Sequence, residues 1–136
     1  MTSRLNPYLN FRGQARDALE FYQAVFGGDF TVMTFGEFGE APPGVEASHV
    51  MHGQLETPMG FTLMISDVPG LMDLTVGTNI AVSLSGDDAD ALRGYWERLS
   101  ADGKVTFPLQ KQMWGDEFGQ CDDKFGIPWL VNISAG

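Results

Sequence analysis

Residues 79–99 read "NIAVSLSGDDADALRGYWERL", and residues 6–26 read "NPYLNFRGQARDALEFYQAVF". Six positions in these two stretches match in character at a constant offset of 73 residues. The matched pairs are Asn6 with Asn79, Leu9 with Val82, Phe11 with Leu84, Leu19 with Leu92, Tyr22 with Tyr95, and Phe26 with Leu99. A single offset that holds through an alternating segment and then through a helical segment indicates two copies of one module.

Each copy begins with apolar side chains that alternate with polar or small ones. This alternation predicts a strand, because successive side chains of a strand point to opposite faces. The apolar set is Leu5, Pro7, Leu9 and Phe11 in strand 5–11, and Ile80, Val82 and Leu84 in strand 79–85. Apolar residues at helical spacing then predict amphipathic helices over 14–26 and 87–103, and each helix ends near glycine.

Three further strands are predicted in each copy. They are residues 30–35, 49–56 and 61–67 in the first copy, and 104–110, 118–126 and 128–134 in the second. Residues 36–48 form a loop rich in glycine and proline, and residues 68–78 are the best internal linker. The sequence therefore predicts one α+β domain over residues 1–136, built from two tandem βαβββ modules at about 5–67 and 78–134.

The composition excludes several classes of partner. The formal net charge is −10, and such a surface repels nucleic-acid backbones and anionic lipids. Cys121 is the single cysteine, so no internal disulfide can form, and no run approaches the roughly 18 apolar residues of a membrane helix. The first residues, "MTSRLNPYLNF", lack the apolar core of a signal peptide. These features predict a cytoplasmic protein that binds neither nucleic acid nor membrane.

Four of the predicted strands share a second face of short neutral polar groups mixed with a few apolar groups. Its members are Asn6, Tyr8, Asn10, Thr62, Met64, Ser66, Asn79, Ala81, Ser83, Pro128, Leu130, Asn132 and Ser134. The ordinary alternative is a sheet face that is simply wetted by solvent. A wetted face usually carries Lys and Glu, whereas these positions carry neither. The pattern favours the lining of a sheltered small-molecule pocket.

Three segments resemble one known family. They are "LNPYLNFRGQARDALEFYQAVFGG" (5–28), "VMHGQL" (50–55) and "MWGDEFGQCDDKFGIPWLVNIS" (113–134). Together they are similar to the PhnB-like branch of the vicinal oxygen chelate superfamily, which includes glyoxalase I, extradiol dioxygenases, and bleomycin and fosfomycin resistance proteins. The resemblance implies a cup of antiparallel and mixed strands with the helices on its outer face, and a homodimer. The branch has carried a methyltransferase name, but no glycine-rich cofactor loop follows a strand in this sequence.

The resemblance also implies positions for a divalent metal, which enzymes of the superfamily hold with one residue from each of four strands. Carried over by position, these residues are Asn6, about Met64, Asn79 and about Leu130. Divalent metals of this class prefer imidazole and carboxylate ligands. We therefore predict no chelated catalytic metal and no other cofactor, with a metal at a relocated site as the alternative. His49 and His52 are three apart on a predicted strand and point to opposite faces, so they do not easily share one ion.

Among the ionisable groups, His52 is the best candidate for a role in a site. It shares a face with Gln54 and titrates near neutrality, so it could orient a ligand or act as a general base. A histidine whose ring is satisfied by a backbone carbonyl is the equally weighted alternative. Cys121, beside two aspartates, is interpreted as structural. Trp114 and Phe118 either wall the entrance of the cup or pack a loop.

The sequence thus predicts a small-molecule-binding protein whose ligand and reaction are unknown. The predicted ligand-binding residues are Asn6, Tyr8, His52, Gln54, Met64, Asn79, Ser83, Trp114, Leu130 and Asn132. Three alternatives stay open: a metal-dependent lyase, isomerase or dioxygenase of the same superfamily; a metal-independent enzyme with His52 as its base; and a structural or regulatory dimer with a vestigial cup.

Overall fold

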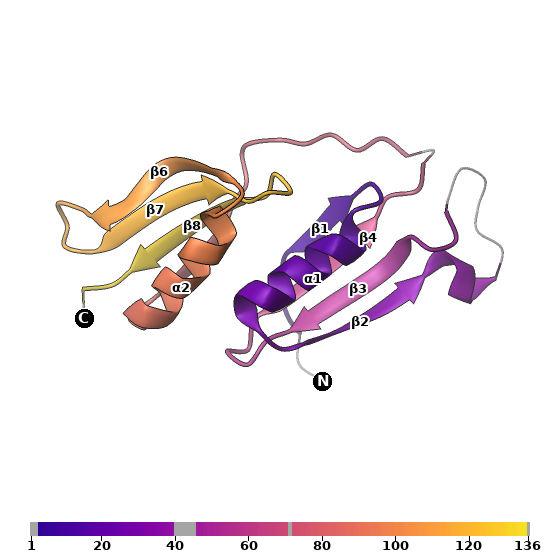
Figure 1. Ribbon diagram of the computed structural model, residues 1–136, viewed down its shortest axis with the longest axis horizontal. Coiled ribbons are helices and arrows are strands. Elements are labelled where there is room, and N and C mark those ends of the chain that lie inside the picture. The colour runs from indigo at the N-terminus through magenta and orange to yellow at the C-terminus, as the bar shows by residue number, and fades with distance from the viewer. Residues whose placement is uncertain (1–2, 40–45, 71, 136) are drawn as a thin grey trace. The chain divides into compact units, whose positions relative to one another are not determined.

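The computed structural model describes residues 3–39, 46–70 and 72–135 (Figure 1). The chain divides into two compact units, Met1–Val76 and Gly77–Gly136, and each is described here by itself. Part of the predicted loop over 36–48 falls on residues 40–45, which lie outside the described residues. No helix in the described part of the chain is both long and apolar enough to traverse a lipid bilayer.

The first unit is a four-stranded mixed sheet with one α-helix. Its elements are β1 (Tyr8–Phe11), α1 (Ala15–Phe26), β2 (Asp29–Thr34), the 3-10 helix η1 (Phe35–Phe38), β3 (Val50–Glu56) and β4 (Thr62–Asp67). The strands lie in the order β1-β4-β3-β2. The first strand pairs with the last in parallel, and the other two pairings are antiparallel.

The second unit repeats this arrangement. Its elements are β5 (Val82–Gly86), α2 (Ala89–Ser100), β6 (Lys104–Lys111), β7 (Glu117–Asp122) and β8 (Pro128–Ile133). The order is β5-β8-β7-β6, again with the first strand parallel to the last. The repeated order confirms the predicted α+β fold of two βαβββ modules.

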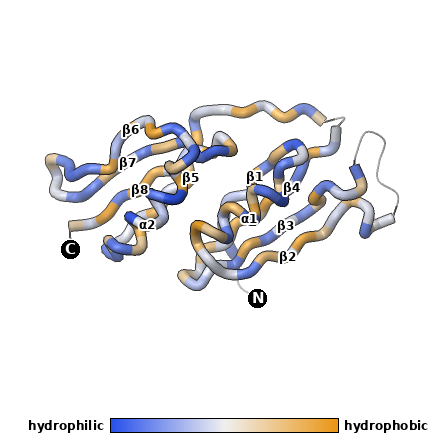
Figure 2. The backbone as a smooth tube through the Cα atoms, viewed as in Figure 1, coloured by the Kyte–Doolittle hydropathy of each residue, from blue (hydrophilic) through white to orange (hydrophobic). Residues whose placement is uncertain are grey.

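The helix of each unit packs on one face of its sheet (Figure 1). All five matched apolar pairs of the internal repeat lie within these elements, and in four of them both partners are buried. Along the chain, apolar and polar residues alternate over short distances in both units (Figure 2), as expected for strands and helices with one buried face. The approach of α1 is close at Gly53, where a Cβ atom would lie 2.5 Å from Leu19 Cδ1.

The start of α1 is held by a carboxylate from another element. The residue before this helix, Gln14, makes no side-chain capping hydrogen bond. Instead, Asp67 at the end of β4 accepts from the backbone N–H of Ala15 through Oδ1 and from that of Val50 through Oδ2, both at 3.0 Å. Asp67 is only 3% exposed. One buried carboxylate therefore joins the helix, β3 and β4.

A second buried aspartate shapes the β7–β8 turn. Asp123 Oδ1 accepts from the backbone N–H groups of Phe125 and Ile127, and its Oδ2 accepts from Trp129 Nε1 at 2.8 Å. Trp129 is fully buried. The indole N–H of a buried tryptophan needs a partner, and this turn supplies one.

The predicted starts of β1 and β5 are wrong by three residues each. Leu5 is 101% exposed and Ile80 is 77% exposed, so neither belongs to the apolar layer that the alternation predicted. The parallel pairings begin only at Tyr8 and Val82. The carbonyl of Pro7 still accepts from the backbone N–H of Met64 in β4, but the paired register starts at Tyr8, and Leu5 and Ile80 are exposed.

We expect Asp67→Asn to lower the free energy of unfolding by about 2 kcal/mol, because a buried donor left without an acceptor costs about 1–3 kcal/mol. The amide offers one acceptor oxygen to two backbone N–H groups and turns its own NH₂ toward the second. Urea unfolding followed by circular dichroism measures the change. The exposed Asp73→Asn is the matched control, and equal stability of the two variants would contradict the role given to Asp67.

Candidate functional site

The face of each sheet opposite its helix is called the open face. In the first unit, the side chains that alternate with the buried ones make up this face. They are Tyr8, Asn10, Asp29, Thr31, Met33, His52, Gln54, Glu56, Thr62, Met64 and Ser66, of which Ser66 is itself buried. The strand register sets Met64 directly between Tyr8 and Gln54. A hydroxyl, a thioether and an amide thus form one row across three strands.

Tyr8 and His52 form a pair on this face. The Tyr8 hydroxyl lies 3.2 Å from His52 Nδ1, and the ring centroids are 5.7 Å apart. Tyr8 is 47% exposed and His52 is half-buried. The hydrogen bond engages one ring nitrogen of His52 and leaves Nε2 for another partner. The partner of the ring is therefore a side chain, and not the backbone carbonyl of the alternative interpretation.

His49 lies elsewhere. It precedes β3, and its ring is next to Gly13 in the β1–α1 connection, where a Cβ atom would lie 3.3 Å from His49 Cε1. The β2–β3 register shifts between Met33 and Thr34, so the strand is irregular between the two histidines. The two rings have different neighbours, as the sequence predicted. Among the described residues, no three His, Cys, Asp or Glu side chains are grouped closely enough to hold a metal ion.

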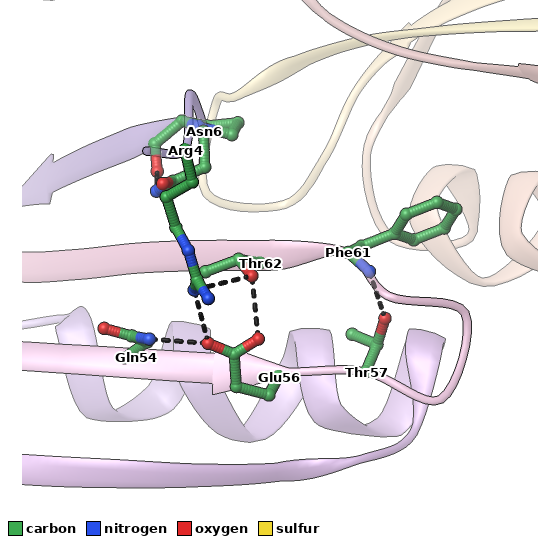
Figure 3. Close-up of polar contacts among 8 residues, drawn as sticks. Arg4, Asn6, Gln54, Glu56, Thr57, Phe61 and Thr62 are labelled. Atoms are coloured by element: carbon green, nitrogen blue, oxygen red, sulfur yellow. Dashed lines mark hydrogen bonds and ion pairs between the residues drawn. The ribbon is translucent and has the colours of Figure 1, made fainter. Parts of the chain in front are cut away.

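A polar cluster surrounds Glu56 at the end of β3 (Figure 3). Glu56 Oε1 accepts from Arg4 Nη1 at 2.8 Å and from Gln54 Nε2 at 2.5 Å, and Oε2 accepts from Thr62 Oγ1 at 2.7 Å. The hydrogen bonds from Thr62, Gln54 and Arg4, in that order, lower the pKa of Glu56 from 4.5 to about 2. Glu56 is therefore a carboxylate at any physiological pH.

The open face of the second unit has a comparable mixture of groups. Its side chains are Ser83, Ser85, Lys104, Phe107, Gln110, Phe118, Gln120, Asp122, Pro128, Leu130 and Asn132. Leu130 lies between Ser83 and Gln120 in the register. A hydrogen bond orients the Asn132 amide, whose Nδ2 donates to Asp116 Oδ2 at 3.1 Å. The other carboxylate oxygen, Asp116 Oδ1, accepts from the backbone N–H of Ala135 at 3.0 Å.

Aromatic rings gather at one end of this face. Trp114 is 63% exposed and makes an edge contact with Phe118, with ring centroids 6.4 Å apart. Phe118 makes a second edge contact with Phe107, at 5.6 Å. The sequence reasoning joined Trp114 with Phe118 but missed Phe107. The β6–β7 register shifts on both sides of Phe107, and simple alternation does not reveal such a shift.

Within each unit, the structure brings together most of the predicted ligand-binding residues. Tyr8, His52, Gln54 and Met64 share the first open face, and Ser83, Leu130 and Asn132 share the second. Asn6 and Asn79 precede their strands, and the Asn6 amide donates to the carbonyl of Pro7. The sequence reasoning did not assign Arg4, Glu56 or Asp116 to the site. Glu56 could have been found from the sequence, because it lies two residues after Gln54 and therefore on the same face of the predicted strand.

The residues at the superfamily's metal positions do not fit a divalent metal. Met64 offers a thioether, and Leu130 offers no donor atom. Asn6 and Asn79 lie outside the strands that would aim them, and amide oxygens are weak neutral ligands beside imidazole and carboxylate.

Cys121 lies on the helix face of β7 and is fully buried. Desolvation, followed by the charges of Asp123 and Asp122, raises the pKa of its thiol to about 11. A thiol with so high a pKa is a poor nucleophile. This supports the structural interpretation of Cys121.

Solved structures place this fold in a known class. A glyoxylase/bleomycin resistance protein/dioxygenase domain from Frankia superposes with a TM-score of 0.67 at 16% identity, covering 98% of this chain and 93% of that one. Protein PA1353 from Pseudomonas aeruginosa gives 0.85 at 28% identity, covering 98% of each chain. A PhnB protein from Bacillus cereus gives 0.78 at 20% identity, covering 97% of this chain and all of that one. The fold is therefore that of the glyoxalase/bleomycin resistance/dioxygenase superfamily.

The chain belongs to the PhnB-like family described as 3-demethylubiquinone-9 3-methyltransferase, whose model matches residues 3–132. The match spans both units, and it confirms the resemblance drawn from the three sequence segments.

We expect Glu56→Gln to lower the free energy of unfolding at pH 7 by at most about 1 kcal/mol, because the carboxylate is largely exposed and solvent screens it. The folded-state pKa lies below the ordinary value of 4.5. The stabilisation is therefore complete above pH 4.5 and is lost as the pH falls toward 2. Urea unfolding at pH 7 and pH 2.5 measures it.

The control for this prediction is Glu20→Gln, which removes one exposed charge from α1. A Glu56→Gln deficit that persists unchanged at pH 2.5, or one that Glu20→Gln matches at pH 7, would show that the hydrogen bonds of Glu56 do not stabilise its ionised form.

Proposed function

We propose that this protein binds a small polar or aromatic molecule on its open faces, at the residues named above. The observation that carries the proposal is the Tyr8–His52 pair on a sheet face that also carries hydroxyl, amide and thioether groups, with the Glu56 carboxylate at the end of β3. The two rings, whose planes are tilted by 44°, offer apolar contact, and Nε2 of His52 offers a hydrogen bond, which is the mixture found in ligand sites.

Binding is preferred to methyl transfer, although the family carries a methyltransferase description. β1 passes into α1 through residues 12–14, and β5 passes into α2 through residues 87–88. Neither connection is the glycine-rich cofactor loop that would favour methyl transfer. The Frankia domain shares this fold under a name that joins resistance and oxygenase activities.

A second candidate is a metal-independent enzyme with His52 as its general base. The same pair favours it, since the bond to Tyr8 orients the ring and leaves Nε2 for a proton transfer. Mass spectrometry of each bound compound after incubation separates the two functions. Recovery of unchanged compound supports binding alone, whereas conversion that His52→Ala abolishes supports the enzyme.

We expect compounds from a library of small phenols, aromatic amides and aromatic amines to raise the thermal unfolding temperature of the wild-type protein. Tyr8→Phe should weaken their binding by about tenfold, the effect of one lost hydrogen bond in a site. His52→Ala should weaken it at least as much. Isothermal titration calorimetry measures the dissociation constants.

Thr106→Val is the control, because it removes a hydroxyl from β6 that donates to the backbone carbonyl of Gln120 and lies outside the proposed ligand set. If Tyr8→Phe and Thr106→Val weakened binding of the compounds equally, the proposed site would be wrong. A library that stabilises no variant, wild type included, would sink the binding function itself.

We also propose that two copies of the chain form a homodimer. Large apolar side chains are exposed in the single chain, among them Trp114, Met113 and Val76. Light scattering should give twice the mass of the 14.9 kDa chain at micromolar concentration. A mass of one chain at every concentration would contradict the dimer.

A further inference from the structure

We propose that the open faces are built to receive hydrogen-bond donors, so that the ligand is an aromatic amidine or amine. The inference rests on the proposed binding function and narrows its ligand class. It follows from how two amide side chains, Gln54 in the first unit and Asn132 in the second, are held by neighbouring carboxylates.

In the first unit, the amide nitrogen of Gln54 donates to Glu56. Figure 3 shows the amide oxygen turned away from this carboxylate. No other described residue donates to that oxygen. Gln54 also lies beside Met64 in the row that begins at Tyr8. A carbonyl oxygen is thus left available on the face where we place the ligand.

In the second unit, the amide nitrogen of Asn132 donates to Asp116, whose other oxygen already accepts from the backbone of Ala135. Among the described residues, no donor approaches the Asn132 oxygen. Asn132 pairs across the strands with Phe118. The second open face therefore also presents an amide oxygen, next to an aromatic ring.

The orientation of both amides is fixed by chemistry. A carboxylate has acceptors and no donor, so an amide beside it must present its NH₂ group. Rotating either amide by half a turn would set two oxygens against each other. Each unit thus has one amide side chain that is oriented by a neighbouring carboxylate, although the residue types differ. In both units the amide oxygen stays available to accept a hydrogen bond from the ligand.

A hydrogen-bond acceptor on the protein favours a ligand that has a donor. If the ligand presented an acceptor instead, the amide oxygen of the protein would lose its hydrogen bond with water and gain no new one. The formal net charge of −10, with Glu56 on the first open face and Asp116 bonded to Asn132 of the second, favours a cation over an anion. Each open face also carries an aromatic ring that adds apolar contact, Tyr8 in the first unit and Phe118 in the second. Together these features select an aromatic group that carries N–H donors and a positive charge.

The test compares benzamidine with benzoate, two probes of one size with opposite hydrogen-bonding character. Titrations followed by ¹⁵N–¹H correlation spectra report the dissociation constants and also the side-chain NH₂ signals of Gln54 and Asn132. We expect benzamidine to bind at least about tenfold more tightly, as one charge-assisted hydrogen bond allows. The NH₂ signals should persist in the complex, because their carboxylate partners are retained.

Asp116→Asn tests whether the carboxylate of Asp116 orients the amide of Asn132. The new amide can still accept from Ala135 with its oxygen and can donate to Asn132, which frees the Asn132 NH₂ for the ligand. The preference for benzamidine should fall at least about fivefold, less than one full charge-assisted bond. Asp90→Asn, on the exposed first turn of α2, removes the same charge and should leave the preference unchanged.

Equal binding of the two probes, tighter binding of benzoate, or equal effects of Asp116→Asn and Asp90→Asn would overturn the inference while leaving the binding function standing. So would library compounds that lack N–H and O–H groups and still perturb Gln54 and Asn132. If neither probe and no library compound perturbs the open faces, the proposed function fails, and the inference fails with it.

Discussion

The carboxylate of Asp67 is the constraint on which the first unit depends. A helix begins with backbone N–H groups that have no partner within the helix, and the sequence before α1 supplies no capping side chain. Asp67 meets that need from β4 and at the same time binds the first residue of β3. The helix is thereby registered against the two central strands. The helix covers one face of the sheet, and Tyr8, His52 and Gln54 lie on the other.

Most of the fold could be predicted because its signal is periodic and occurs twice. The pairs Leu19 with Leu92 and Tyr22 with Tyr95 are buried in both helices, as a repeated amphipathic pattern requires. The strand starts could not be predicted in the same way. Leu5 and Ile80 continue the alternation, but a strand extends only as far as it has a partner, and pairing partners are distant in sequence.

The candidate site was predictable in part for the same reason. Alternation assigned Leu130 and Asn132 to the second face and put His52 and Gln54 on one face of their strand, and the strand register agrees. The contacts that orient these groups were not predictable. Arg4 reaches Glu56 from before the first strand, and Asp116 reaches Asn132 from a turn. Such bonds depend on three-dimensional proximity, which periodicity does not encode. The cup, the cytoplasmic location and the boundaries of the modules stay predictions.

The parallel pairing of first and last strands bears on how the chain is made. β1 has no strand partner until β4 exists, so the sheet of the first unit is incomplete for most of that unit's synthesis. Once residue 67 has been added, every strand of that sheet has its neighbour, and so does the amino end of α1. The amino-terminal half then holds all of its own pairing partners while the carboxyl-terminal half is still unmade. An ancestral single module, before its duplication, would have met the same condition.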